Sequence, residues 1–380
     1  MNSPTPPSRA LQGAARLAVE ATLGVTDLVE AVHARAATLP GLRADARTRG
    51  VTGLVYRSVR GVTRAVGEGL ERALGLLGPA LQQLGGTPRQ AEREALLAAL
   101  NGVLGDHLAA TDNPLALTMQ LRQAGQPVRI GDGSRPDRPG ALLLLHGLCM
   151  NDRQWQRKSQ DLGALLSQPL GLTPLQLRYN SGLPIHRNGA ELATLLEQLV
   201  SDWPGGLQRL VLLGHSMGGL IARSALHQAR AQGLSWPQRV SELICLGSPH
   251  AGAPLERIGQ QIDRLLEATP YAAPFARLGQ LRSAGINDLH DGKVLEDGAP
   301  TPLPPGLRSL AVAGQLAGKL KAKALGDGLV TVASALGEHA QPGRQLDFSE
   351  RLRLEGVSHL DLLSDPAVAA GLQQWLGCAA

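Results

Sequence analysis

The sequence predicts an α/β protein built on a mostly parallel sheet. From about residue 112 onward, short apolar runs alternate with amphipathic segments of helical length, which is the pattern of repeated strand–helix units. Residues 141–145 are apolar at every position, as expected of a strand buried on both faces. Hydrophobic residues make up 43 % of the chain and aromatic residues only 2 %, so Leu, Val and Ala must build the core.

The expected elements follow in order along the second part of the chain. A hairpin is expected across Ala124-Gly125, with strands at 117–121 and 127–130. Further strands are predicted at 141–145, 174–179, 209–214, 240–246, 308–313 and 351–355, and helices at 152–167, 187–202, 217–231 and 365–376. Residues 253–305 interrupt this alternation with amphipathic and irregular sequence.

The first part of the chain has a different texture. Residues 1–111 are interpreted as a separate helical segment, and residues 112–380 as one domain of alternating strands and helices. Apolar residues recur every three or four positions between Val55 and Leu77, and another helix is expected to begin near Thr87-Pro88. No motif that carries chemistry occurs in this segment.

Composition excludes several classes of function. The formal charge is +5 without a Lys/Arg block, which argues against a nucleic-acid partner. Three widely spaced cysteines favour neither a disulfide framework nor a zinc site, and we expect no metal. No G-x-G-x-x-G follows the first strand and no P-loop occurs, so no cofactor is expected.

Localisation follows from what the sequence lacks. The first sixteen residues do not form a signal peptide, and no run of about 18 apolar residues occurs. We therefore expect a cytoplasmic protein. Peripheral contact with a membrane surface is left open, and nothing in the sequence indicates an oligomeric state.

The sharpest chemical signal is a G-x-S-x-G motif around Ser216. It reads Gly214-His-Ser-Met-Gly218, with an apolar strand before it and a helix after it. This context is that of the nucleophile elbow of α/β-hydrolases, where a tight turn lifts the serine hydroxyl above the sheet. We therefore predict the α/β-hydrolase fold with Ser216 as the nucleophile.

A nucleophilic serine needs a base, and the base needs an acid that orients it. In this fold the order along the chain is Ser, Asp, His. His359 follows a predicted late strand and is the expected base. Asp327 lies between glycines after the strand at 308–313 and is the expected acid, with Asp288 and Asp291 as rivals. His215, beside the serine, is expected to point away and pack.

An oxyanion hole needs two backbone N–H donors. Met217, which follows the nucleophile, is expected to supply one, and Leu148, after the first buried parallel strand, the other. His146 is then interpreted as a brace for this loop. Cys149 is interpreted as a small apolar filler rather than a second nucleophile.

These motifs together resemble one group of enzymes. Leu145-His-Gly147, the elbow, Gly247-Ser-Pro-His-Ala-Gly-Ala-Pro254, Gly326-Asp-Gly328 and Ser358-His-Leu360 resemble bacterial triacylglycerol lipases and GPI inositol-deacylase-like esterases. The resemblance implies a lid at about 253–305, with Ile258, Ile262, Leu265 and Leu266 facing an acyl pocket or only packing the lid. Some such lipases bind calcium near the histidine loop, where Asp361 stands here.

We therefore predict a serine hydrolase that cleaves lipid or acyl esters, with a small-molecule or lipid ester as its partner. An acyltransferase or a thioesterase on the same three residues is an alternative. A catalytically silent binding or membrane-associated protein is an alternative of another class.

Overall fold

The computed structural model describes residues 13, 16, 57, 60, 90–128, 138–260, 282–317 and 326–378. The chain divides into two units, Met1–Pro88 with Ala110–Ala116, and Arg89–Ala109 with Leu117–Ala380. In the first unit, the Asn113 side chain donates a hydrogen bond to the Gly13 carbonyl at 3.1 Å. The apolar stripe expected between Val55 and Leu77 lies outside the described residues.

The second unit is built on a mostly parallel sheet of eight described strands, as predicted. Their order is β10-β9-β8-β7-β3-β6-β1-β2, and only the pairs that involve β1 are antiparallel. The strands are β1 (Gln120–Gln123), β2 (Gln126–Pro127), β3 (Gly140–Leu145), β6 (Thr173–Arg178), β7 (Arg209–His215), β8 (Val240–Leu246), β9 (Arg308–Gln315) and β10 (Glu350–Glu355).

The strand order reverses direction at β3. From β3 the chain continues into β6 on one side of it, and from there into β7 on the other side. Leu145 at the end of β3 is in register with Leu177 of β6 and Gly214 of β7. Ligands of open α/β sheets bind at the carboxyl ends of strands where such a reversal occurs. The ends of β3 and β7 therefore mark the expected site.

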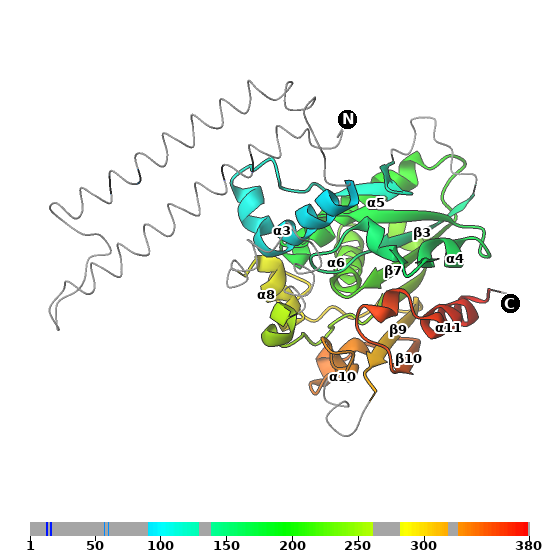
Figure 1. Cartoon of the computed structure of the whole chain (residues 1–380). Coiled ribbons are helices and arrows are strands. Elements are labelled where there is room, and N and C mark those ends of the chain that lie inside the picture. The colour runs from blue at the N-terminus through cyan, green and yellow to red at the C-terminus, as the bar shows by residue number, and fades with distance from the viewer. Residues whose placement is uncertain are drawn as a thin grey trace. The chain divides into compact units, whose positions relative to one another are not determined.

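Helices cover both faces of the sheet (Figure 1). Leu142 and Leu144 of β3 belong to an apolar cluster with residues of α4 and α11, and alternation along the strand turns Leu143 and Leu145 to the opposite face. On the remaining side α5 contacts α6, which also contacts β3, β7 and β8. The helices are α4 (Leu162–Ser167), α5 (Ile185–Asp202), α6 (Met217–Ala231), α10 (Val332–Ala335) and α11 (Pro366–Leu376), with short turns η2 (Trp236–Arg239), η4 (Pro342–Arg344) and η5 (Asp361–Leu363).

The predicted helix at 152–167 is wrong over its first ten residues. The chain instead forms a short turn η1 (Asp152–Trp155) and a small hairpin of β4 (Gln156–Arg157) and β5 (Gln160–Asp161), and only then enters α4. Lys158 and Ser159 have φ of 50° and 63°, which makes a tight hairpin turn without glycine. The Asp161 carboxylate accepts a hydrogen bond from the Ala164 N–H at 2.9 Å and caps α4.

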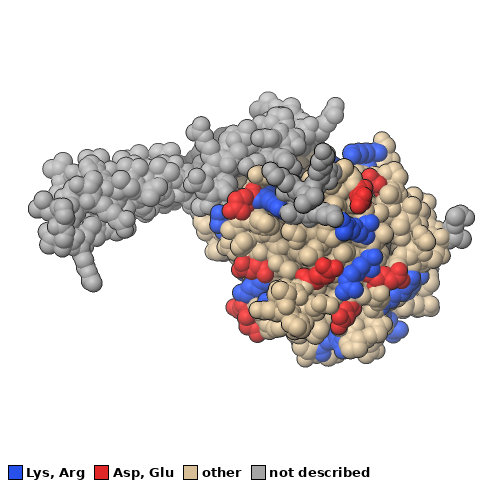
Figure 2. Space-filling view, turned by 90° about the horizontal axis from the view of Figure 1, so that it is seen from below, with Lys and Arg blue, Asp and Glu red and all other residues tan. Residues whose placement is uncertain are grey.

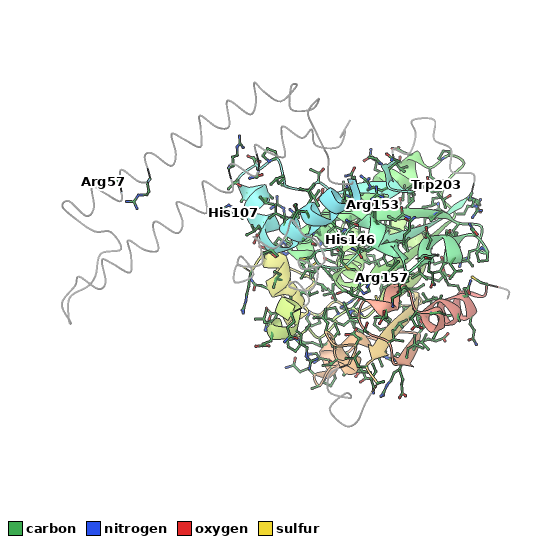
Figure 3. The ribbon with its side chains drawn as sticks, in the orientation of Figure 1. Arg57, His107, His146, Arg153, Arg157 and Trp203 are labelled. Carbon is green, nitrogen blue, oxygen red and sulfur yellow. The ribbon has the colours of Figure 1, made fainter. Side chains whose placement is uncertain are left out.

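Helix α3 (Gln90–Ala110) packs on the sheet unit through buried ion pairs. Glu94 lies 2.5 Å from Arg153 and 3.1 Å from Arg178, and Arg178 also pairs with Asp152 at 2.6 Å. Burial raises the pKa of Glu94, but hydrogen bonds from Arg178 and Arg153 outweigh it, so the pKa is lowered overall. Figure 3 labels Arg153 near α3. The domain boundary at residue 111 stays a prediction, although this helix precedes it and contacts the sheet unit.

The lid expected at about 253–305 is described over residues 253–260 and 282–305. The Ala253 N–H donates to the His290 carbonyl at 3.2 Å, and the His290 ring nitrogen Nδ1 lies 2.8 Å from the Ala253 carbonyl. These bonds hold the start of the segment against α8 (Ala284–Asp291). Ile258 is buried, whereas Ile262, Leu265 and Leu266 lie outside the described residues. The lid stays a prediction.

Acidic and basic side chains are interspersed on the face of the molecule that Figure 2 shows. Among the helices of the described ranges, none is both long and apolar enough to cross a membrane.

The ion cluster under α3 predicts a large effect of Glu94→Ala on stability. Removing this carboxylate takes an acidic partner from Arg122, Arg153 and Arg178, and Asp152 remains as a partner of Arg122 and Arg178. We expect the free energy of unfolding to fall by about 3 kcal/mol in denaturant titrations. Lys158→Ala breaks an exposed pair with Asp361 and should change it by less than about 1 kcal/mol. Equal effects of the two substitutions would contradict the interpretation.

Candidate active site

Ser216 occupies a strained turn between β7 and α6. It has φ 54° and ψ −122°, a region that residues with a side chain rarely adopt. Its N–H donates to the Leu246 carbonyl at the end of β8 at 2.8 Å. The turn therefore holds the serine at the carboxyl edge of the sheet, directly before the first residue of a helix.

The glycines of the motif make this turn sterically possible. A Cβ on Gly218 would collide with the carbonyl oxygen of Leu145 at the end of β3. A Cβ on Gly214 would collide with the backbone of Gly219 at the start of α6. Strand and helix can approach this closely only because both positions lack side chains, as expected from the sequence.

His359 and Asp327 form a buried, directly bonded pair. The ring nitrogen Nδ1 of His359 donates to Oδ2 of Asp327 at 2.7 Å, and both side chains are at most 5 % exposed. The other carboxylate oxygen accepts from the N–H groups of Leu329 and Val330 at 2.9 and 2.8 Å. The His359 N–H also donates to the Asp327 carbonyl at 2.9 Å. These bonds place the imidazole proton on Nδ1 and leave Nε2 available for proton transfer.

The elbow and this pair lie beside one another at the sheet edge. A Cβ on Gly247, which follows β8, would lie 3.0 Å from Oδ2 of Asp327 and 3.2 Å from Nδ1 of His359. The ring centroids of His215 and His359 are 4.7 Å apart. Within the described residues no hydrogen bond joins the Ser216 hydroxyl to His359, and such bonds often tighten only when substrate is bound.

His215 was expected to point away from the site, but its ring lies beside His359. Its Nε2 lies 3.0 Å from the carbonyl oxygen of His359 and holds the loop that carries that residue. Burial, together with the nearby charge of His359, lowers the pKa of His215 well below its ordinary value. A neutral ring donates this bond. The sequence does not reveal that His215 binds the His359 loop, because the two residues are 144 positions apart.

The loop after β3 runs directly past Ser216. A Cβ on Gly147 would lie 3.1 Å from the Cβ of Ser216. In the described part of the chain, the N–H groups of Leu148 and Met217 have no acceptor. Met217 is the first residue of α6, where backbone donors remain unpaired and the helix dipole favours negative charge. The two donors predicted for an oxyanion are therefore free and next to the serine.

His146 and Cys149 support this loop, and neither side chain is charged at neutral pH. The His146 ring stacks on Tyr179 with centroids 4.1 Å apart, and its Nδ1 lies 2.8 Å from the Gly147 carbonyl. Burial lowers the pKa of His146 to about 4, so it is neutral near pH 7. Burial raises the pKa of the Cys149 thiol to about 12, which removes its thiolate at neutral pH. Figure 3 labels His146 near the centre of the unit.

The rival acids lie elsewhere. The Asp288 carboxylate accepts the N–H of Ile185 at 2.8 Å and caps helix α5. Asp291 is exposed. Asp361 pairs with Lys158 at 2.7 Å and accepts from the Ser358 hydroxyl at 2.5 Å, and the Lys158 hydrogen bond is the main cause of its lowered pKa. No group of three potential metal ligands occurs within the described residues.

No sequence pattern predicts the contact between the β4–β5 hairpin and the loop of His359. Lys158 at the hairpin turn and Asp361, two residues after His359, are 203 positions apart. Only the fold brings them together. The hairpin therefore braces the histidine loop from outside.

The buried neutral His146 predicts acid sensitivity. Its pKa is about 4 in the folded chain against an ordinary 6.5, so the unfolded chain takes up a proton first as the pH falls. The free energy of unfolding therefore falls as the pH drops below about 6.5. At 1.36 kcal/mol per pKa unit, the loss caused by His146 reaches about 2 kcal/mol at pH 4.5.

His146→Asn keeps a donor near Nδ1 but does not titrate. Denaturant unfolding at pH 7 and pH 4.5 should therefore show a smaller loss of stability in the variant than in the wild type, by about 2 kcal/mol. The buried His215 and His250 are present in both proteins and cancel in this difference. Identical losses would show that His146 is not buried as a neutral ring.

Comparisons with known proteins bear on this arrangement. Residues 192–280 match the sequence profile of the PGAP1-like alpha/beta domain family. A 2-hydroxy-6-oxononadienedioate/2-hydroxy-6-oxononatrienedioate hydrolase from Klebsiella pneumoniae is 26 % identical over 145 residues, which cover 36 % of this chain and 46 % of that protein. The chain therefore spans less than half the length of this relative.

Similar solved structures include the mature lipase BlEst2 of Bacillus licheniformis, 19 % identical, covering 69 % of this chain and 98 % of that one with a TM-score of 0.44. The RedJ thioesterase of Streptomyces coelicolor is 17 % identical, covering 67 % and 98 % with a TM-score of 0.37. At such scores these likenesses add nothing to the assignment. The parallel sheet, the strained serine turn and the two sequence matches place this chain in the α/β-hydrolase superfamily.

Proposed function

We propose that this protein is a serine hydrolase that cleaves carboxylic esters through Ser216, His359 and Asp327. The observation that carries the proposal is the buried His359–Asp327 bond of 2.7 Å, at the sheet edge where Ser216 occupies a strained turn. Strain of this kind persists where the surrounding structure enforces it, and it is common at active sites. The strained turn supports a role for Ser216 as the nucleophile, with His359 as its base and the N–H groups of Leu148 and Met217 as oxyanion donors.

The reaction begins with attack of the Ser216 oxygen on the ester carbonyl carbon. The hydroxyl proton passes to Nε2 of His359, and Asp327 stabilises the resulting imidazolium. The carbonyl oxygen becomes an oxyanion that accepts hydrogen bonds from the N–H groups of Leu148 and Met217. When this intermediate collapses, the bond to the alcohol breaks and the alcohol leaves with the proton from His359.

Water completes the cycle. His359 takes a proton from a water molecule as its oxygen attacks the acyl-enzyme carbonyl. The second tetrahedral intermediate uses the same two donors. Its collapse breaks the bond to Ser216, which recovers its proton, and releases the carboxylic acid. Ser216 and His359 are 3 % and 4 % exposed, so this chemistry is shielded from bulk water.

The substrate class rests on sequence resemblance. Gly247–Pro254 resembles the corresponding stretch of lipase-like esterases, and in the structure it begins beside Asp327 and His359. We therefore propose an acyl or lipid ester as substrate, bound under the segment at about 253–305.

Ser216→Ala tests the nucleophile. The wild type should be labelled by a fluorophosphonate probe and should hydrolyse short p-nitrophenyl esters. The variant should show no labelling, and kcat should fall by about 10⁴-fold or more, because no group remains to form the acyl-enzyme. Wild-type protein that is folded but neither labelled nor active would favour a catalytically silent binding protein.

Asp327→Asn tests the orienting acid. If the asparagine oxygen keeps the bonds from Leu329 and Val330, its NH₂ group faces Nδ1 of His359 and forces the proton onto Nε2. The ring can then no longer accept the serine proton, and we expect kcat to fall by about 10⁴-fold.

Asp288→Asn is the matched control, since Asp288 is a carboxylate that accepts a backbone N–H away from His359. The control should keep kcat within a few-fold of the wild type. A small effect of Asp327→Asn, or equal effects of both, would argue against Asp327.

A further inference from the structure

Helix α3 contacts the loop after β3, here called the oxyanion loop because it carries the proposed donor Leu148. At the point of contact no side chain fits. Gly102 of α3 faces Cys149, the residue after Leu148. A Cβ on Gly102 would lie 2.9 Å from both Cα and N of Cys149 and would overlap its Sγ. The thiol Sγ lies 3.7 Å from the Ala99 carbonyl one turn earlier in the helix. The loop therefore rests directly on the helix backbone.

The loop is held from its other side as well. The Cys149 N–H donates to the Ser181 hydroxyl at 3.0 Å. The neighbouring Asn180 side chain donates to the Gly105 carbonyl of α3 at 2.8 Å, and a Cβ on Gly105 would collide with this side chain. Helix α3 thus touches both the loop after β3 and the loop after β6. These two loops in turn are joined to each other through Cys149.

The helix itself is anchored at both ends of this contact. Near its start, Glu94 binds Arg153, which lies just beyond the oxyanion loop. Near its end, Asp106 accepts the N–H of Ala284 at 2.8 Å, and the Gly102 carbonyl accepts from the Ser283 hydroxyl at 2.7 Å. Ser283 caps α8, which lies beside α3 in Figure 1. These contacts hold α3 in place on both sides of the contact with Cys149.

Cys149 shows that the loop conformation depends on these contacts. Its φ is 59°, which is unfavourable for a residue with a side chain and persists where packing enforces it. The side chain is 4 % exposed. A strained residue immediately follows the proposed oxyanion donor, and the helix backbone forms one wall of its pocket. Cys149 is bonded directly to Leu148, so a displacement of Cys149 also moves the backbone that carries the Leu148 N–H.

We propose that α3, through the close contact between Gly102 and Cys149, positions the Leu148 N–H for oxyanion binding. The inference rests on the proposed function and assigns Gly102 as a positioning residue for it. An oxyanion donor that is lost lowers kcat by about 10²- to 10³-fold, and a displacement of about 1 Å has effects of similar size. A helix outside the sheet thereby sets the rate of the reaction.

Gly102→Ala tests the contact. The added methyl group must displace Cys149, so kcat/KM should fall by about 10- to 100-fold with little change in KM. Affinity for a trifluoromethyl ketone, which forms a tetrahedral oxyanion on the serine, should fall by the same factor. Loss of stability alone would not produce this pairing, since the folded fraction would bind the analogue as the wild type does.

A swap of side chains provides the control. Cys149→Gly removes the thiol side chain and accepts a φ of 59° without strain, and should itself lower kcat/KM because the loop loses its packing. In the double variant the new methyl group fills part of the vacated space, so the double variant should be more active than Gly102→Ala alone. Ala95→Gly weakens α3 by about 1 kcal/mol without adding a group against the loop, and should keep the wild-type kcat.

The outcomes separate the two proposals. A folded Gly102→Ala variant with wild-type kcat and wild-type analogue affinity would overturn the role of α3 and leave the hydrolase intact. If no variant at Gly102 folds, Cys149→Gly decides, and a wild-type kcat there would overturn the role. Wild-type protein that is neither labelled nor active contradicts the proposed function itself.

Discussion

The turn at Ser216 is the constraint on which the rest of the site depends. A residue with a side chain is held at φ 54° between a strand and a helix, and the glycines on either side let β3 and α6 approach it. This geometry places Ser216 at the carboxyl edge of the sheet and leaves the first backbone donor of α6 unpaired. The proposed nucleophile and one of the two proposed oxyanion donors therefore come from a single local conformation.

The remaining groups reach the turn through neighbouring strand ends. Asp327 and His359 follow β9 and β10, and the backbone bonds of Asp327 leave its second oxygen for the imidazole. His215 links the elbow to the His359 loop, so the proposed base is held by the residue that precedes Ser216. The carboxylate of Asp327 and the loop of His359 are thus each held by several hydrogen bonds. The arrangement is preorganised, which is how enzymes stabilise charge that develops during reaction.

The outer support of the site consists of long-range contacts that no local pattern signals. Residues 156–161 were expected to be helical, and instead turn through Lys158 and Ser159 against the histidine loop. Both turn residues adopt positive φ without being glycine, so the usual mark of a hairpin is missing. Helix α3 was expected to belong to a separate segment, and its glycines at 102 and 105 instead contact the loops after β3 and β6. Single glycines in a helix indicate close approach but not the partner.

The sequence by itself determined the strand–helix alternation, the parallel sheet, and the residue types at Ser216, Asp327 and His359. These features follow from hydrophobic periodicity and from a turn that admits few residues, and both are properties of neighbouring positions in the chain. Only the tertiary structure decided which loops meet at the sheet edge, that His215 holds the loop of His359, and that α3 touches the loop after β3. Such contacts join positions about 50 to 200 residues apart, and their energy depends on packing that no local pattern encodes.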